Sequence, residues 1–311
     1  MTDEVPVARN IVRGLSSPPA AVSQSSPNVR FSVVVAISLL LWWKPLVSSF
    51  ALALSSDQYT HILLILPVSL TLICLEWKGA ACSSELRSPF NYILLPIAVA
   101  AAAIARFQIL PPLPDQRLAA NMLALVVCWI VAFRMAFGSR AFQRALFPLC
   151  FLLWMVPIPE VLLSPIIRGL QEGSTASARI LFASYGIPVA QDGTLLAIPG
   201  LTIEVARECS SIRSSLMLVV TTMVLAQLGL RSAWRKALVV AVAVPLSIAK
   251  NGLRIFVLGM LTTRVDRSYI DGRLHHQGGI IYFLLALAAI ALLICAARYG
   301  EKKSLLSPSR D

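Results

Sequence analysis

Apolar residues in this chain come in long runs that short polar segments separate. A helix needs about 20 mainly apolar residues to cross roughly 30 Å of hydrocarbon. Eight runs are candidate spans on this basis, and they cover approximately residues 31–54, 61–76, 91–107, 118–135, 145–165, 210–230, 237–260 and 276–298. The pattern therefore predicts an all-α polytopic membrane protein with about eight transmembrane helices.

The segments around these runs have a different character. Residues 1–30 are rich in proline and serine and lack apolar periodicity, which predicts a flexible tail. The segment 166–208 carries five glycines, an amphipathic stretch near 174–185, and alternating residues that turn at Asp192-Gly193 and Pro199-Gly200. This alternation predicts a small hairpin that lies outside the bilayer.

Composition agrees with a membrane protein and argues against two other classes. Of the 311 residues, 57% are hydrophobic and only 14% are charged. Soluble domains carry roughly 25% charged residues, and disordered chains are defined by low hydrophobicity. The composition therefore excludes a disordered chain. It also speaks strongly against a soluble enzyme, whose core cannot hide so much apolar surface.

The net charge of +12 predicts the orientation of the spans. Cytoplasmic loops of membrane proteins collect Lys and Arg, and this explanation is favoured over nucleic-acid binding. If the N-terminus is cytoplasmic, 15 basic residues fall on the cytoplasmic side and seven on the other. We therefore expect cytoplasmic tails at 1–30 and 300–311, a transmembrane domain over 31–299, and an outer segment at 166–208.

Polar residues inside or beside spans are costly in a bilayer, so they are candidates for function. The first candidate is Cys209, which precedes the sixth predicted span within a run of serines that includes Ser210. Unpaired N–H groups and the helix dipole at such a position favour a thiolate, which is the nucleophilic form. Arg213 follows four residues later on the same helix face. The alternative is a serine-rich capping turn with an incidental cysteine.

The second candidate is a polar group inside the seventh span. Lys250, Asn251 and Arg254 share one helix face, and Arg254 lies about 26 Å from a helix start at residue 237. Arg254 is therefore expected near the outer surface, where its charge would stabilise a developing oxyanion. The alternative is an arginine that extends to the lipid headgroups.

The third candidate is the pair His275-His276, where the eighth span begins on the outer side. A neutral imidazole there would take the proton of a thiol and return it to a leaving amine. The alternative is an interfacial histidine pair without chemistry.

Two competing functions remain open from the residues alone. His61 also begins a span from the outer side, and three imidazoles from His61, His275 and His276 would bind Zn²⁺ in a metal-dependent hydrolase. No HExxH motif supports this, and the six cysteines form no CxxC pair or metal spacing. Lys250 and Arg254 would alternatively bind the anion of a transporter.

Taken in order, these motifs resemble the exosortase/archaeosortase family of membrane-embedded cysteine transpeptidases. Its motif of Cys, Ser, Gly and a nearby Arg matches residues 209–213, with Ser211 in the place of Gly. Its Asn-x-x-Arg-Ile motif matches residues 251–255. Its motif of His, then Gly four residues later and an aromatic residue, matches His275, Gly279 and Phe283. Its Tyr-x-His segment is similar to residues 59–61, and the likeness covers about 55–300.

The resemblance implies a sortase-like reaction on the extracytoplasmic face of the inner (plasma) membrane of a prokaryote. Its substrates would be exported proteins with a C-terminal sorting signal, which comprises a short motif such as Pro-Glu-Pro, a transmembrane helix and a basic cluster. Cys209 would form a thioester, Arg254 would stabilise the oxyanion or bind the motif's carboxylate, and His275 would act as base and acid. Supporting roles fall to Ser210, Arg213, Lys250, Asn251 and His276. The resemblance implies no metal and no cofactor, and the distribution of basic residues argues against a nucleic-acid partner.

Overall fold

The computed structural model describes residues 26–76, 113–205, 212–265 and 279–306, and most of these residues are helical. The α-helices are α1 (Pro27–Leu41), α2 (Trp43–Ser55), α3 (Ile62–Glu76), α5 (Pro114–Arg144), α6 (Leu146–Phe151), α7 (Glu160–Ser184), α8 (Ile212–Gly229), α9 (Ala233–Arg264) and α11 (Gly279–Leu306). Two 3₁₀ helices, η1 (Asp57–Tyr59) and η2 (Leu152–Met155), precede α3 and follow α6. The predicted span at 91–107 lies outside the described residues.

The apolar helices confirm an all-α polytopic membrane protein. Five segments are long and apolar enough to span a bilayer, and two sharply bent helix pairs raise the number to seven if each pair is one span. The five correspond to the predicted runs at 61–76, 118–135, 210–230, 237–260 and 276–298. They are observed as Asp57–Glu76, Pro114–Arg144, Ile212–Gly229, Ala233–Arg264 and Gly279–Lys303.

Two predicted spans are bent rather than continuous. The run at 31–54 breaks at Trp42, and the axes of α1 and α2 differ by 73°. Pro45 has no N–H to bond the carbonyl of Leu41, which explains a break at this point. The run at 145–165 ends earlier than predicted, because Pro157 and Pro159 interrupt the helix before α7 begins.

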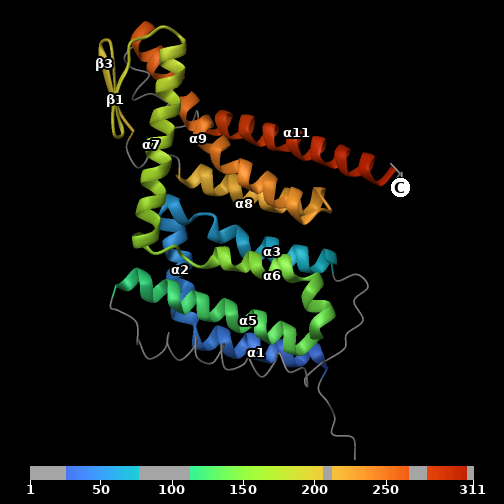
Figure 1. Ribbon diagram of the computed structural model, residues 1–311. Coiled ribbons are helices and arrows are strands. Elements are labelled where there is room, and N and C mark those ends of the chain that lie inside the picture. Colours follow the sequence, from blue (N-terminus) through green and yellow to red (C-terminus); the bar gives the residue numbers. More distant parts are fainter. Residues whose placement is uncertain (1–25, 77–112, 206–211, 266–278, 307–311) are drawn as a thin grey trace, which may run out of the picture.

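The third difference from the sequence-based expectation is the length of α7. The predicted amphipathic stretch near 174–185 is the second half of a 25-residue helix that already begins at Glu160. Its axis lies at 95° to that of α6–η2, and Figure 1 shows it running past the ends of α5, α6 and α8. Ile167 and Phe182 are buried, whereas Arg168 and Arg179 are exposed. We call the end of the bundle covered by residues 160–184 the α7 side.

The predicted hairpin is confirmed and has a third strand. Strands β1 (Ala190–Asp192), β2 (Leu195–Ile198) and β3 (Leu201–Glu204) form an antiparallel sheet in the order β1-β2-β3. Gly193 and Gly200 have φ of 55° and 80° in the two turns, a region that glycine enters without steric cost. Figure 1 shows the sheet beside the C-terminal half of α7.

The buried apolar residues form three clusters. The largest joins α3, α5, α6 and η2, and it includes Ile212 and Val220 of α8. A second cluster holds α8, α9 and α11 together, and it contains Leu218, Val239 and Ile290. The third packs β2 and α9 against α7. Helix α8 belongs to both larger clusters, so it is packed on two sides, and its first residue, Ile212, lies in the largest cluster.

Candidate active site beside the start of α8

The centre of the site is a buried lysine between two antiparallel helices. Lys250 of α9 is 7% exposed, and its Nζ donates a hydrogen bond to Oγ of Ser214 in the first turn of α8. A hydroxyl is thus the hydrogen-bond acceptor of this ammonium group among the described residues. The pair fixes the level at which α9 passes the start of α8.

Arg254 lies one turn further along α9, on the same face as Lys250. It is half-buried, and it interacts electrostatically with Lys250 and with Tyr282 in the first turn of α11. Arg254 therefore lies one helical turn from the Lys250–Ser214 hydrogen bond at the start of α8. Because four residues advance a helix by about 6 Å, Arg254 extends beyond the level of Ser214 in the direction away from the α8–α9 turn.

The residues between these two cations fasten α9 to α7. Asn251 is 1% exposed. A Cβ atom at Gly252 would lie 2.5 Å from Cβ of Ser177 and 3.0 Å from the backbone nitrogen of Ala178, so only glycine allows this approach. The polar face predicted for Lys250, Asn251 and Arg254 is therefore part of one rigid helix, α9, that packs closely against α7.

Arg213 pairs with a residue that the sequence analysis did not select. Its Nη1 lies 2.7 Å from Oδ1 of Asp57 in η1, and both side chains are more than half exposed. This ion pair ties the first turn of α8 to the start of α3. The sequence carries no local signal for a pair 156 residues apart.

Gln171 is a second residue that sequence reasoning missed. From α7, its Nε2 donates a hydrogen bond of 2.8 Å to the carbonyl of Val205, which is 1% exposed. The N–H of Val205 in turn bonds the carbonyl of Thr194 at 3.0 Å. Val205 is the last described residue before the segment that contains Cys209, so α7 and the sheet fix the point from which that segment departs.

His61 lies close to the same side of the bundle. It is 2% exposed, and its ring meets that of Trp154 edge-on at 6.2 Å between centroids. Nearby, the hydroxyl of Tyr59 donates a 2.8 Å hydrogen bond to the carbonyl of Ile158, just before α7. Within the described ranges, no three His, Cys, Asp or Glu side chains are placed to hold a metal ion.

Four of the predicted site residues, Cys209, Ser210, His275 and His276, lie outside the described residues. The structure brings Lys250, Ser214 and Arg254 together at the start of α8, whereas Arg213 is turned to Asp57. The described part of the site thus consists of its cations and their supporting contacts.

These features define a class of protein: a polytopic helical membrane protein with a polar, cationic site at one end of its bundle. The family model for transmembrane exosortases matches residues 42–292, most of the chain and all of the site. The chain belongs to the transmembrane exosortase family. Comparison with curated proteins and with solved structures returned no match. Family membership gives the chain a general role as a membrane transpeptidase of protein sorting that processes exported proteins.

Proposed function

We propose that this protein is a cysteine transpeptidase that cleaves C-terminal sorting signals of exported proteins through a thioester on Cys209. The signal comprises a short motif such as Pro-Glu-Pro, a transmembrane helix and a basic cluster. The observation that carries the proposal is the polar face of α9, on which Arg254 lies one helical turn beyond the Lys250–Ser214 hydrogen bond at the start of α8, in a chain that matches the exosortase family over residues 42–292.

Chain length supports a common site for the three proposed catalytic groups. Cys209 precedes Ile212 by three residues, and an extended chain spans at most about 11 Å over that distance. His275 precedes Gly279 by four residues, which corresponds to about 14 Å at most. Because α8 begins beside the Lys250–Ser214 pair and α11 packs against α9, chain connectivity supports a common site for the thiol and the imidazole near Arg254.

In the first half of the reaction, His275 takes the thiol proton and the sulfur of Cys209 bonds to the carbonyl carbon near the motif. The carbonyl π electrons move to oxygen, and the Arg254 guanidinium stabilises the resulting oxyanion. When this intermediate collapses, the C–N bond breaks and His275 returns its proton to the leaving amine. The substrate then remains bound to the enzyme as a thioester.

In the second half, an acceptor amine, an acceptor hydroxyl or water attacks the thioester carbonyl. His275 removes the proton of this nucleophile, and Arg254 again faces the oxyanion. The Cys209 thiolate then leaves and recovers a proton from His275. The same three groups thus serve both half-reactions, and the cycle consumes no cofactor.

The described contacts have positioning roles in this mechanism. Ser214 with Lys250, and Arg213 with Asp57, hold the first turn of α8 against α9 and η1. Gln171 holds the chain at Val205 on the other side of Cys209. A nucleophile carried between two fixed points loses little orientational freedom when the substrate binds, which lowers the barrier to attack. Asn251, Ser210 and His276 complete the proposed supporting set.

The orientation is also part of the proposal. The α7 side faces outward from the inner (plasma) membrane of a prokaryote, and the tails at 1–30 and 300–311 lie in the cytoplasm. The 15 to 7 distribution of basic residues supports this orientation. The transmembrane catalytic domain then covers 31–299. A substrate helix in the same bilayer presents its scissile bond at a fixed depth on that side.

The decisive test is processing of a reporter protein that carries such a signal, in cells that express the full chain. We expect Cys209→Ala to abolish processing and Cys295→Ala, at an exposed cysteine of α11 that forms no disulfide, to leave it intact. Hydroxylamine is expected to release the reporter from the thioester formed by the wild-type chain. Full processing by Cys209→Ala would refute the mechanism. Inhibition by chelators would instead favour the histidine metal site, and anion flux in proteoliposomes would favour a transporter.

A further inference from the structure

At the end of the bundle opposite the α7 side, the α8–α9 turn and the end of α11 form one continuous surface. The Glu301 carboxylate of α11 accepts hydrogen bonds from the N–H groups of Arg231 (3.1 Å) and Ser232 (2.9 Å) in the α8–α9 turn. Arg235, in the first turn of α9, donates a hydrogen bond of 2.8 Å to the carbonyl of Ala297 in α11. These reciprocal bonds hold the turn and the end of α11 together. We call residues 231–236 and 298–303 the basic end.

The basic end concentrates positive charge. It contains six cations, namely Arg231, Arg235, Lys236, Arg298, Lys302 and Lys303. Its own carboxylate, Glu301, is turned toward backbone N–H groups. Glu76 of α3 reaches this region through Gln227, which donates to Glu76 at 3.2 Å and accepts from Lys236 at 2.8 Å. Six cations thus face two carboxylates, and neither carboxylate forms an ion pair with the lysines at 302–303 in the described structure.

Exposed aromatic side chains indicate that the basic end lies at the boundary of the membrane. Trp234 is 63% exposed and Tyr299 is 72% exposed. The Arg235 guanidinium lies over the Trp234 ring at 5.5 Å from its centroid. The candidate span of α9 begins at Ala233, and that of α11 ends at Lys303. Exposed Trp and Tyr at the ends of spans typically lie at the level of the lipid headgroups.

We propose that the basic end binds the phosphate headgroup of an anionic phospholipid in the leaflet that contacts the α8–α9 turn. At headgroup depth, lipid phosphates are the anions that a bilayer itself supplies. Arg235 is already oriented by Ala297 and Trp234, so its planar donors are arranged for an anion before it binds. A lipid that contacts both segments bridges α9 and α11, and it therefore stabilises the α8–α9–α11 half of the bundle.

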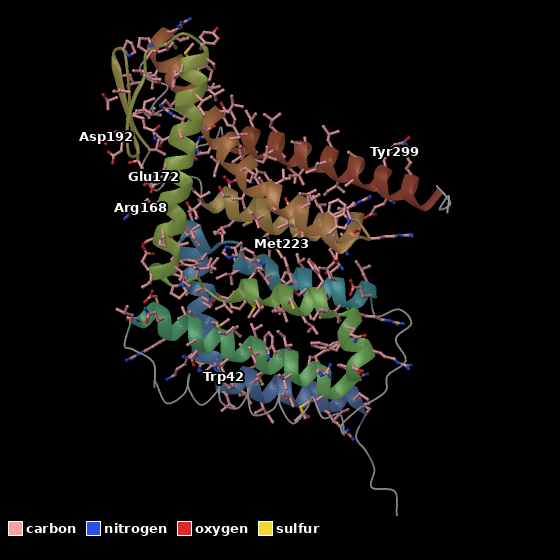
Figure 2. All side chains as sticks on the ribbon, in the orientation of Figure 1. Trp42, Arg168, Glu172, Asp192, Met223 and Tyr299 are labelled. Carbon is pink, nitrogen blue, oxygen red and sulfur yellow. The ribbon has the colours of Figure 1, made fainter. Side chains whose placement is uncertain are left out.

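The test uses the full chain, purified in detergent and exchanged into vesicles of phosphatidylcholine alone or of phosphatidylcholine with phosphatidylglycerol. Bound phosphatidylglycerol is counted by native mass spectrometry, and the melting temperature is measured in parallel. The variant is Lys302→Gln with Lys303→Gln, because both side chains are exposed. The matched control is Arg168→Gln with Arg179→Gln, which removes two exposed cations from α7. Figure 2 shows the labelled Arg168 at the opposite end of the molecule from Tyr299.

We expect phosphatidylglycerol to raise the melting temperature of the wild-type chain. The Lys302/Lys303 variant is expected to bind the lipid roughly tenfold to thirtyfold more weakly, while the α7 control retains wild-type affinity. Binding should also weaken at high salt. Equal losses in both variants would show general adsorption of a basic protein and overturn the proposal. Equal stabilisation by inorganic phosphate without lipid would also overturn it, since the site would then bind any phosphate.

Discussion

Gly252 allows the backbone of α9 to approach α7 closely, two residues before Arg254. Replacing it with alanine adds a Cβ at 2.5 Å from Cβ of Ser177 and 3.0 Å from the nitrogen of Ala178, whereas ordinary contacts begin at 3.4 Å. The second neighbour is backbone, so the helices must separate. Overpacking of this kind costs about 1–3 kcal/mol, and the better helix propensity of alanine returns about 1 kcal/mol. Gly252→Ala should therefore destabilise the protein by up to about 2 kcal/mol.

Two further variants isolate the close approach as the cause. Gly169→Ala adds the same methyl group to α7, where no atom lies within 4 Å, so it should be neutral or stabilising by up to about 1 kcal/mol. Adding Ser177→Gly to Gly252→Ala removes the nearer neighbour and should recover part of the loss. A coupling of about 1 kcal/mol in this double-mutant cycle would assign the cost to the contact itself.

The assay combines thermal unfolding in detergent with processing of the reporter. A shift of about 1 Å in Arg254 relative to the start of α8 can cost up to about 100-fold in rate, so activity should fall more steeply than stability. Wild-type stability and activity in Gly252→Ala would refute the reasoning, because the helices would then have room that the structure does not show. Equal losses in Gly169→Ala would refute it too.

Three other contacts yield predictions of their own. Asp57→Asn should lower stability by at most about 1 kcal/mol, with the difference shrinking in high salt, because both partners of the ion pair are exposed; melting at two ionic strengths measures it. Gln171→Leu leaves the buried Val205 carbonyl without its side-chain donor and should lower the free energy of unfolding by about 1–3 kcal/mol. In the reporter assay kcat should fall more than substrate affinity, and an unchanged kcat would contradict the positioning role of Gln171. Glu301→Gln should lower the melting temperature because a charged acceptor is lost at the α8–α9 turn. Neutralising the exposed Lys303 should leave the melting temperature in phosphatidylcholine unchanged, and equal effects of the two variants would contradict the assigned bonds.

The distribution of apolar residues was sufficient to find the five continuous candidate spans, because a span is defined by composition over about 20 residues. It did not find the bends at Trp42 and before Glu160, since apolar residues continue past each bend. The turns at Gly193 and Gly200 were predictable, because a positive φ restricts the residue type. The alternating residues were interpreted as one hairpin, whereas each of the two turns joins a pair of strands, so the sheet has three strands.

The candidate site divides in the same way. The placement of Lys250, Asn251 and Arg254 on one helix follows from local spacing alone. The contacts that hold the site together do not follow from local spacing. Ser214 lies 36 residues from Lys250, and Val205 lies 34 residues from Gln171. Contacts across such distances depend on how the helices pack, and a single sequence carries no direct record of that packing.

The Glu301 carboxylate has a consequence for biogenesis. Ser232, the first residue at the α9 boundary, makes no capping bond with its own side chain, and the acceptor for its N–H comes from α11. The ribosome makes α8 and α9 before α11, so the hairpin they form enters the bilayer with its turn still open. Closure must wait until the later helix inserts. That same insertion completes the buried cluster of α8, α9 and α11, so the assembly of the proposed catalytic end is coupled to an event at the opposite end of the bundle.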